Sequence, residues 1–402
     1  MRRTFKAFSY RDFRLMWAGA FTSSCGTWMQ EVAQNWLILT MTGSTFLLGL
    51  DAFLGDAPFL VFSLFGGVLA DRMDRRRILL GSQLVQMSSA LVLAALILTG
   101  AVQVWIILML SFVVGLAQSF GGPAYQALVP TLVDREDLPN AVALNSIQFN
   151  LARVVGPVLA GIAFYKLGAA YCFGLNALSF LAPIAALLVL TRGGGTAPTP
   201  ESVLKSLKTG LRAVSDQTAL RSLIGLSFVG SFCAMPLVTF LPVFARSVFH
   251  QDAKGYSVLL AAFGIGAIAG AVGTAFFGQV RHKGVLAVAM QMTFGALMAG
   301  FALSRTPILS YVLLALAGAS LMVVFAMFMT LVQANVEDRL RGRVVSVYSL
   351  AFRGAMPLGN LAAGLFASLS SAPAVLIANG IVMISVGAFV LLRPVGAGLR
   401  GL

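Results

Sequence analysis

The stretch Phe65-Gly-Gly-Val-Leu-Ala-Asp-Arg-Met-Asp-Arg-Arg-Arg77 decides the fold class of this chain. One apolar run begins near Ser44 and leads into it, and another leads away from it to about Thr99. Six of the seven residues in 71–77 are charged. Apolar runs of more than 20 residues match the thickness of a bilayer, and a short basic turn between two of them is typical of a membrane-spanning hairpin. The stretch therefore predicts a membrane protein.

The composition supports this prediction along the whole chain. Of the 402 residues, 58% are hydrophobic and 10% are charged, whereas soluble domains carry roughly 25% charged residues. The net charge of +14 would suit a nucleic-acid-binding protein. However, the positive charge stands in short turns between apolar runs and not along one soluble face, so we expect no nucleic-acid partner.

Residues with catalytic or metal-binding chemistry are sparse. Cys25, Cys172 and Cys233 each stand within an apolar run and are expected to pack, with no disulfide, metal site or cofactor. His250 and His282 fall at opposite helix-end turns and cannot share a site. We therefore expect a protein that is not an enzyme.

The chain contains about twelve apolar runs, each of which is predicted to be a helix because lipid offers the backbone no hydrogen-bond partner. These runs lie near 13–39, 44–70, 77–99, 102–132, 140–167, 169–191, 219–245, 256–280, 284–304, 307–334, 343–369 and 373–392. The long polar segment 192–218, predicted to be helical over 201–217, divides them into two sets of six. The predicted organisation is an N-terminal bundle (1–191), a cytoplasmic linker (192–218) and a C-terminal bundle (219–402).

The positions of lysine and arginine predict the orientation. With the N-terminus inside, the inner segments hold 22 of these residues and the outer turns hold four, and Arg153 and Arg353 lie within apolar runs. Because cytoplasmic loops are enriched in Lys and Arg, both termini are expected in the cytoplasm. The start of the chain is basic but has no signal-peptide cleavage site, which agrees with that orientation.

A weak internal repeat indicates two related halves. Arg153-Val-Val-Gly-Pro157 in the fifth run has the Arg-to-Pro spacing of Arg353-Gly-Ala-Met-Pro357 in the eleventh. The segment Gly278-Gln-Val-Arg-His-Lys-Gly284 stands where a second copy of the opening stretch is expected, but it lacks the acidic residue.

Together with the twelve runs, the segment Gly67-Val-Leu-Ala-Asp71-Arg72-Met-Asp-Arg75-Arg76 resembles the signature of the major facilitator superfamily. One departure is Asp74, which replaces a glycine of that signature. The resemblance implies an all-α integral membrane fold with twelve transmembrane helices in two pseudo-symmetric six-helix bundles. It also implies a latch, in which Gly67, Asp71, Arg72, Arg75 and Arg76 join helix ends in one conformation and release them in another. The alternative is that the arginines only obey the charge rule for cytoplasmic loops.

Three further runs resemble one branch of that superfamily, the exporters related to enterobactin and macrolide efflux proteins. These runs are 27–36, 122–130 and 143–157, and the last leads into Gly156, Pro157 and Gly161, which are similar to an antiporter motif. The chain departs from the branch at Gly121, Gly122 and Tyr125, and its fourth run lacks the arginine of many drug/proton antiporters.

Charged residues within the membrane are costly, which makes them candidates for proton coupling. They are Glu31, Asp51, Asp56, Arg153 and Arg353. One hypothesis is that Asp56 or Asp51 binds the coupling proton while Arg153 or Glu31 adjusts its affinity. The other is a static ion pair, such as Asp56 with Arg153.

Polar residues on the expected cavity-lining runs are candidates for substrate contact, although packing is an alternative for their aromatic neighbours. The candidates are Gln30, Asn35, Gln118, Tyr125, Gln126, Gln333 and Asn335. The prediction is a monomeric secondary transporter of the cell (inner) membrane that exports a small amphipathic molecule, such as a drug, macrolide or siderophore. Proton antiport with alternating access would drive it. The alternative is a passive facilitator or a non-transporting sensor on the same fold.

Overall fold

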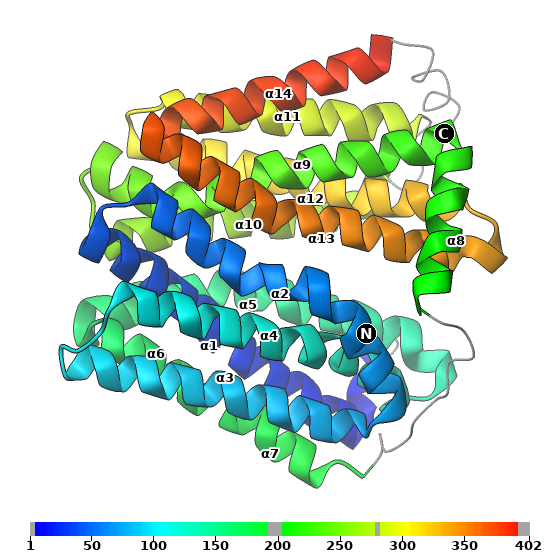
Figure 1. The fold of residues 1–402 in the computed structure, drawn as a ribbon, viewed down its shortest axis with the longest axis horizontal. Coiled ribbons are helices and arrows are strands. Elements are labelled where there is room, and N and C mark those ends of the chain that lie inside the picture. The colour runs from blue at the N-terminus through cyan, green and yellow to red at the C-terminus, as the bar shows by residue number, and fades with distance from the viewer. Residues whose placement is uncertain (1–4, 192–202, 278–281, 393–402) are drawn as a thin grey trace. The chain divides into compact units, whose positions relative to one another are not determined.

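The computed structural model describes the backbone of residues 5–191, 203–277 and 282–392. The side chains of 63–72, 165, 203–206, 275–277 and 338 fall outside that description. Within these ranges the chain consists of long helices joined by short connections (Figure 1).

The helices follow the predicted apolar runs closely. Those before the linker are α1 (Arg11–Thr42), α2 (Thr45–Arg72), α3 (Arg75–Leu98), α4 (Val104–Leu128), α5 (Leu138–Leu167), α6 (Ala169–Ser179) and α7 (Leu181–Val189). Those that follow are α8 (Val203–Asp216), α9 (Thr218–Val243), α10 (Ala253–Phe277), α11 (Lys283–Leu303), α12 (Pro307–Ala334), α13 (Asp338–Leu369) and α14 (Ala372–Leu392). Short helical turns are η1 (Lys6–Ser9), η2 (Val129–Thr131), η3 (Arg135–Asp137) and η4 (Phe244–Val248).

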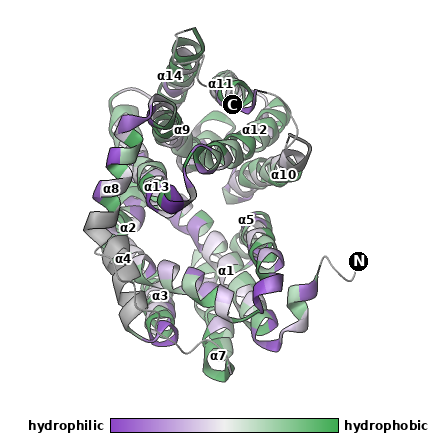
Figure 2. Ribbon diagram, turned by 90° about the vertical axis from the view of Figure 1, so that its right-hand side faces the viewer, coloured by the Kyte–Doolittle hydropathy of each residue, from purple (hydrophilic) through white to green (hydrophobic). Residues whose placement is uncertain are grey.

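The predicted set of twelve transmembrane helices is confirmed in the described part of the chain. Ten spans are long and apolar enough to cross a bilayer, and one of them combines α6 and α7. The other two are α1 and α13, each 32 residues long, whose charged and polar residues lower their hydropathy. Figure 2 shows the contrast with α14, which is hydrophobic along its length.

The sixth predicted helix is interrupted at Phe180, which separates α6 from α7. Pro183 stands three residues later. A proline has no N–H group to donate to the carbonyl four residues earlier, here that of Ser179, and its ring crowds that carbonyl. The break is therefore a local effect of Pro183 within one membrane span.

The chain forms two compact units, and each includes the start of a helix that continues in the other. The first comprises 1–43, 54–200 and 252–261, and the second comprises 44–53, 201–251 and 262–402. The start of α10 thus packs in the first unit, and the start of α2 packs in the second.

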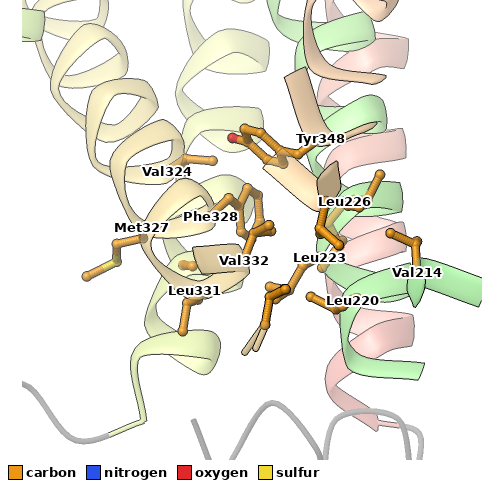
Figure 3. Close-up of a cluster of buried hydrophobic side chains, with 14 of the residues drawn as sticks. Val214, Leu220, Leu223, Leu226, Val324, Met327, Phe328, Leu331, Val332 and Tyr348 are labelled. Carbon is orange, nitrogen blue, oxygen red and sulfur yellow. The ribbon is translucent and has the colours of Figure 1, made fainter. Parts of the chain in front are cut away.

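Each unit has its own cluster of buried apolar side chains. In the first, Phe13, Met16, Leu79, Leu128 and Leu187 bring α1, α3, α4 and α7 together. In the second, side chains of α8, α9, α12 and α13 converge around Phe328 and Tyr348 (Figure 3). Because lipid is as apolar as these residues, close packing contributes much of the association between helices inside the bilayer.

Candidate functional site

One face of α1 carries most of the polar chemistry of the first unit. Trp28, Glu31 and Asn35 stand at positions i, i+3 and i+7, a spacing that places them on the same side of a helix. Glu31 is exposed on the surface of the chain, whereas Asn35 is buried. A carboxylate at this depth in a membrane span is costly unless an opposite charge or water compensates it.

Arg153 of α5 is the positive charge beside Glu31. The two side chains interact electrostatically, and the guanidinium carbon of Arg153 lies 5.3 Å from the centre of the Trp28 ring. A cation over the face of an indole is attracted by the ring quadrupole. Trp28 also meets Phe149 of α5 edge to face, with ring centres 6.2 Å apart. The structure therefore brings Glu31, Trp28 and Arg153 together, which we call the α1–α5 charge site.

Gly156, one turn beyond Arg153, allows this close approach. A side chain at Gly156 would collide with Cβ of Trp28 and would lie 2.8 Å from the carbonyl oxygen of Cys25. Gly161, farther along the same helix, faces Ser257 of α10, whose Cβ would be 3.1 Å from an added side chain. Gly156 and Gly161 therefore serve as contact points of α5 with α1 and with the start of α10, while Pro157 lies between them inside the helix.

Tyr256, at the start of α10, completes the site and was not among the predicted residues. Its side chain is 1% exposed, and its hydroxyl accepts a hydrogen bond from Nδ2 of Asn35 at 3.3 Å. Its ring stacks on Trp36 with centres 6.4 Å apart, and it also interacts electrostatically with Glu31. No local pattern distinguishes this tyrosine from a packing aromatic, because its partners come from α1, more than 200 residues earlier.

The other predicted charges occupy different places. Asp51 is buried in the start of α2, which belongs to the second unit, whereas Asp56 is exposed in the part of α2 that belongs to the first. Arg353 is exposed on α13 in the second unit. One hypothesis from the sequence paired Arg153 with Asp56. The acid that the structure describes near Arg153 is Glu31.

Several of the predicted cavity residues form hydrogen bonds between helices of the first unit. Gln30 accepts from Asn176 at 2.7 Å, Gln118 accepts from Gln86 at 3.4 Å, and Tyr125 donates to Asn145 at 2.6 Å. Bonds of this kind satisfy polar groups that lipid cannot satisfy.

The remaining cavity candidates are less engaged with other helices. Asn335 donates to the carbonyl of Leu331 at the end of α12, Gln126 is exposed, and Gln333 is half-buried.

The sequence analysis did not predict the partners Asn176, Gln86 and Asn145, nor the related residue Gln148. Gln148 on α5 donates to the Ala20 carbonyl and to Ser24 of α1 at 3.2 and 3.0 Å. The sequence does contain a signal for these residues, because an amide side chain inside an apolar run predicts an interhelical hydrogen bond. That signal does not identify which helix supplies the partner.

The basic turn 71–77 includes the first residues of α3, and these bind the ends of other helices. Arg75 donates to the carbonyl of Ala127 at the end of α4 at 3.2 Å, and Arg76 donates to the carbonyls of Leu188 and Leu190 at the end of α7. Helix C-termini carry unsatisfied carbonyls and partial negative charge, which makes arginine a favourable partner. The side chains of Gly67, Asp71 and Arg72, predicted for the latch, lie outside the described residues.

A cluster of polar side chains joins η1 and the residue before α1 to the η3 turn. Lys6 forms an ion pair with Asp137 at 3.0 Å, and the Tyr10 hydroxyl donates to Asp137 and Asp134 at 2.8 and 3.0 Å. The hydrogen bond to Asp137, followed by burial and the bond to Asp134, raises the pKa of Tyr10 to about 12. The same pairing with Asp137 raises the pKa of Lys6, so both groups keep their protons at neutral pH.

Comparison with known proteins places the chain in a family. The model of the transmembrane secretion effector family of major facilitator proteins matches residues 3–397. The multidrug efflux pump Tap of Mycolicibacterium fortuitum is 28% identical over 93% of this chain and 94% of its own. Macrolide efflux protein A of Streptococcus pyogenes is 23% identical over 88% and 89%, and the enterobactin exporter EntS of Citrobacter koseri is 27% identical over 84% and 80%.

A solved structure supports the fold independently of sequence similarity. The nucleoside transporter NupG superimposes with a TM-score of 0.72 at 14% identity, covering 94% of this chain and 98% of NupG. At that identity the likeness concerns the fold alone. The chain is a multi-pass membrane protein that belongs to the transmembrane secretion effector family of the major facilitator superfamily.

Proposed function

We propose that this protein is a secondary active exporter of a small amphipathic molecule, driven by proton antiport and working by alternating access. The observation that carries the proposal is the α1–α5 charge site, in which a carboxylate and a guanidinium interact electrostatically within membrane-spanning helices. Relatives that match most of the chain are a multidrug efflux pump, a macrolide efflux protein and an enterobactin exporter, which supports the direction and the class of substrate.

In this mechanism Glu31 is the proton carrier, and Arg153 senses its charge. While Glu31 is ionised, it attracts Arg153 and keeps α1 and α5 in one arrangement. Protonation removes that attraction, while the contact between Arg153 and the Trp28 ring remains, and the change favours a different arrangement of the helices. Asp51 and Asp56 are the alternative carriers, and Arg353 is an alternative sensor.

The aromatic surface of Trp28 and Phe149 beside a carboxylate suits a substrate with an apolar body and a polar or cationic group.

The transport cycle also needs a cytoplasmic gate. We assign this gate to the basic turn 71–77. Asp71 and Arg72 form and break its contacts, and Arg75 and Arg76 anchor the turn to α4 and α7. In this proposal both termini face the cytoplasm, and the protein functions as a monomer in the cell membrane.

The test is efflux from an efflux-deficient bacterial host, scored against drugs, macrolides and siderophores with and without a protonophore. We expect lower accumulation of at least one compound, with the difference abolished by the protonophore. Unchanged accumulation across the panel would contradict export. Efflux that resists the protonophore would remove the antiport mechanism and favour a passive facilitator.

The carrier is tested by replacing single acids. Glu31→Gln should abolish protonophore-sensitive efflux, whereas Glu136→Gln, the same change at an exposed acid of η3, should leave it intact. Asp51→Asn and Asp56→Asn complete the set. If Glu31→Gln transports normally and one of the aspartate variants does not, the proton carrier lies on α2.

A further inference from the structure

Helix α8 lies crosswise to α9 and α13 within the second unit (Figure 1). Its inward face consists of Leu207, Gly210 and Val214, at positions i, i+3 and i+7. A side chain at Gly210 would be 2.6 Å from the carbonyl oxygen of Arg343, so the backbones of α8 and α13 are in close contact there. Val214 joins the apolar cluster of Figure 3. The helix is therefore firmly seated on the unit.

The opposite face of α8 combines cations with an exposed leucine. Lys208, Leu211, Arg212 and Ser215 stand at i, i+3, i+4 and i+7, and all four are exposed. Leu211 has 52% of its surface exposed. In the part of the chain that the structure describes, neither Lys208 nor Arg212 forms an ion pair. Figure 2 shows this mixture as purple and green along α8.

Further exposed arginines lie on the elements that α8 contacts. Arg221 stands in the first turn of α9, and Arg339 and Arg341 stand in the first turn of α13. Arg339 pairs with Glu337 at 2.8 Å, and Asp216 is the exposed acid of α8 itself. This surface consists of the outer face of α8 and the starts of α9 and α13. Among its described side chains, cations outnumber acids.

The position of α8 relative to the bilayer follows from α9. The apolar span that includes α9 begins at Thr218, and only Gln217 separates it from α8. A helix that joins the end of a membrane span and runs crosswise to it lies along the membrane surface. Exposed leucine between cations is the pattern of helices that rest in this interface, with the apolar side chain in the acyl boundary and the cations at phosphate level.

We propose that the outer face of α8 binds the phosphate groups of anionic phospholipids, with Lys208 and Arg212 as the principal contacts and Leu211 as the apolar anchor. Arg221 and Arg341 extend the site toward α9 and α13. A cation close to an anionic membrane surface contributes about a fivefold increase in binding. The two contacts together should therefore account for about a 25-fold preference for anionic over zwitterionic lipid.

The experiment is native mass spectrometry of the full chain, purified in detergent and titrated with phosphatidylglycerol or phosphatidylcholine of the same chain length. We expect the wild type to retain phosphatidylglycerol preferentially. The double variant Lys208→Gln/Arg212→Gln should lose most of that preference. The control Lys254→Gln/Arg305→Gln removes two exposed cations, one in the first turn of α10 and one just before α12, and should keep that preference.

Two further arms separate lipid binding from simple charge effects. Leu211→Ser should weaken retention of phosphatidylglycerol, because it removes the apolar anchor and leaves both cations in place. Glycerol phosphate at the same concentration should not displace the lipid. The proposal is overturned if the control variant loses the preference equally, if phosphatidylcholine binds as well as phosphatidylglycerol, or if glycerol phosphate competes. Thermal unfolding of each variant at the wild-type temperature confirms that the comparison concerns folded protein, and none of these readouts depends on transport.

Discussion

Helices α5 and α13 make the same contacts in their two units but carry different chemistry. Gly156 of α5 meets the backbone of α1 at Cys25, and Gly359 of α13 meets the backbone of α9 at Phe232. Five residues later, Gly161 receives Ser257, the fifth residue of α10, and Gly364 receives Gly49, the fifth residue of α2. The two glycine contacts of α5 are therefore repeated in α13 with the same five-residue spacing.

The glycine contacts correct the register of the internal repeat. They relate α5 to α13 by a shift of 203 residues, whereas the matching Arg-Pro spacing in the sequence relates them by 200. Arg353 therefore lies three residues farther from its contact glycine than Arg153, or about 4.5 Å along the helix axis. The two arginines are not structural equivalents.

The facing helices differ as well. When α1 and α9 are aligned at their first residues, Trp28, Glu31 and Asn35 correspond to Met235, Val238 and Pro242. The first unit thus has a carboxylate, an indole and an amide where the second has apolar residues. A fold built from two similar bundles can keep its helix contacts and still concentrate charge in one bundle, because the contacts depend on small residues and the charge depends on a different face.

The largest expected effect comes from the shared backbone contacts. Gly359→Ala places a methyl group against the carbonyl of Phe232, so α9 and α13 must separate, at a cost of about 3 kcal/mol or more. We expect a low yield of folded protein and a lower melting temperature in detergent. Gly225→Ala on α9 is the control, because a side chain there meets no atom within 4 Å. Equal losses in both variants would show that the contact is not responsible.

The difference in charge is tested by a double-mutant cycle on thermal stability. Glu31→Gln and Arg153→Met should show a coupling energy on the order of 1 kcal/mol, because removing one partner leaves the other charge uncompensated. Glu31→Gln and Arg353→Met should be additive within about 0.5 kcal/mol. Equal coupling energies for the two pairs would contradict the inference that Arg153 and Arg353 differ in their interaction with Glu31.

Tyr256→Phe removes the hydroxyl of Tyr256 and keeps its ring, so it separates their contributions to stability. The variant loses the hydrogen bond from Asn35 but keeps the stacking on Trp36, so it should cost about 1 kcal/mol of stability. Thr239→Val in the second unit removes the bond from Thr239 to Asn360 and should cost a similar amount. A neutral Tyr256→Phe variant would assign the contact to the aromatic ring alone.

The smallest loss of stability is expected at the second pair of glycine contacts, those of Gly161 and Gly364. A methyl group at Gly161 meets only the side chain of Ser257, at 3.1 Å, and we expect a cost below about 1 kcal/mol. Gly364→Ala should cost more, because its neighbours at 3.0 Å are backbone atoms of Gly49 and Thr45. Comparing the melting temperatures of these two variants measures the difference directly, and a greater loss at Gly161 would contradict it.

Much of the fold could be predicted from the sequence because membrane spans are a local property. A run of about 20 apolar residues must form a helix wherever it lies, since its backbone can find hydrogen-bond partners only within itself. The twelve spans and their limits follow from that constraint, and α1 and α13 depart from the hydropathy pattern only because they carry polar faces. The role of Asp71 and Arg72 stays a prediction.

The sequence by itself determined that this is a twelve-span membrane protein and which residues put charge into the bilayer. Only the tertiary structure decided which of those charges meet: Glu31 lies beside Arg153, Tyr256 joins them from α10, and Arg353 is out of register with Arg153. The physical reason is that pairing depends on how each helix is rotated and how closely it approaches its neighbour. Small residues such as Gly156 and Gly359 set that approach, and their partners lie on other helices, beyond the reach of any local pattern.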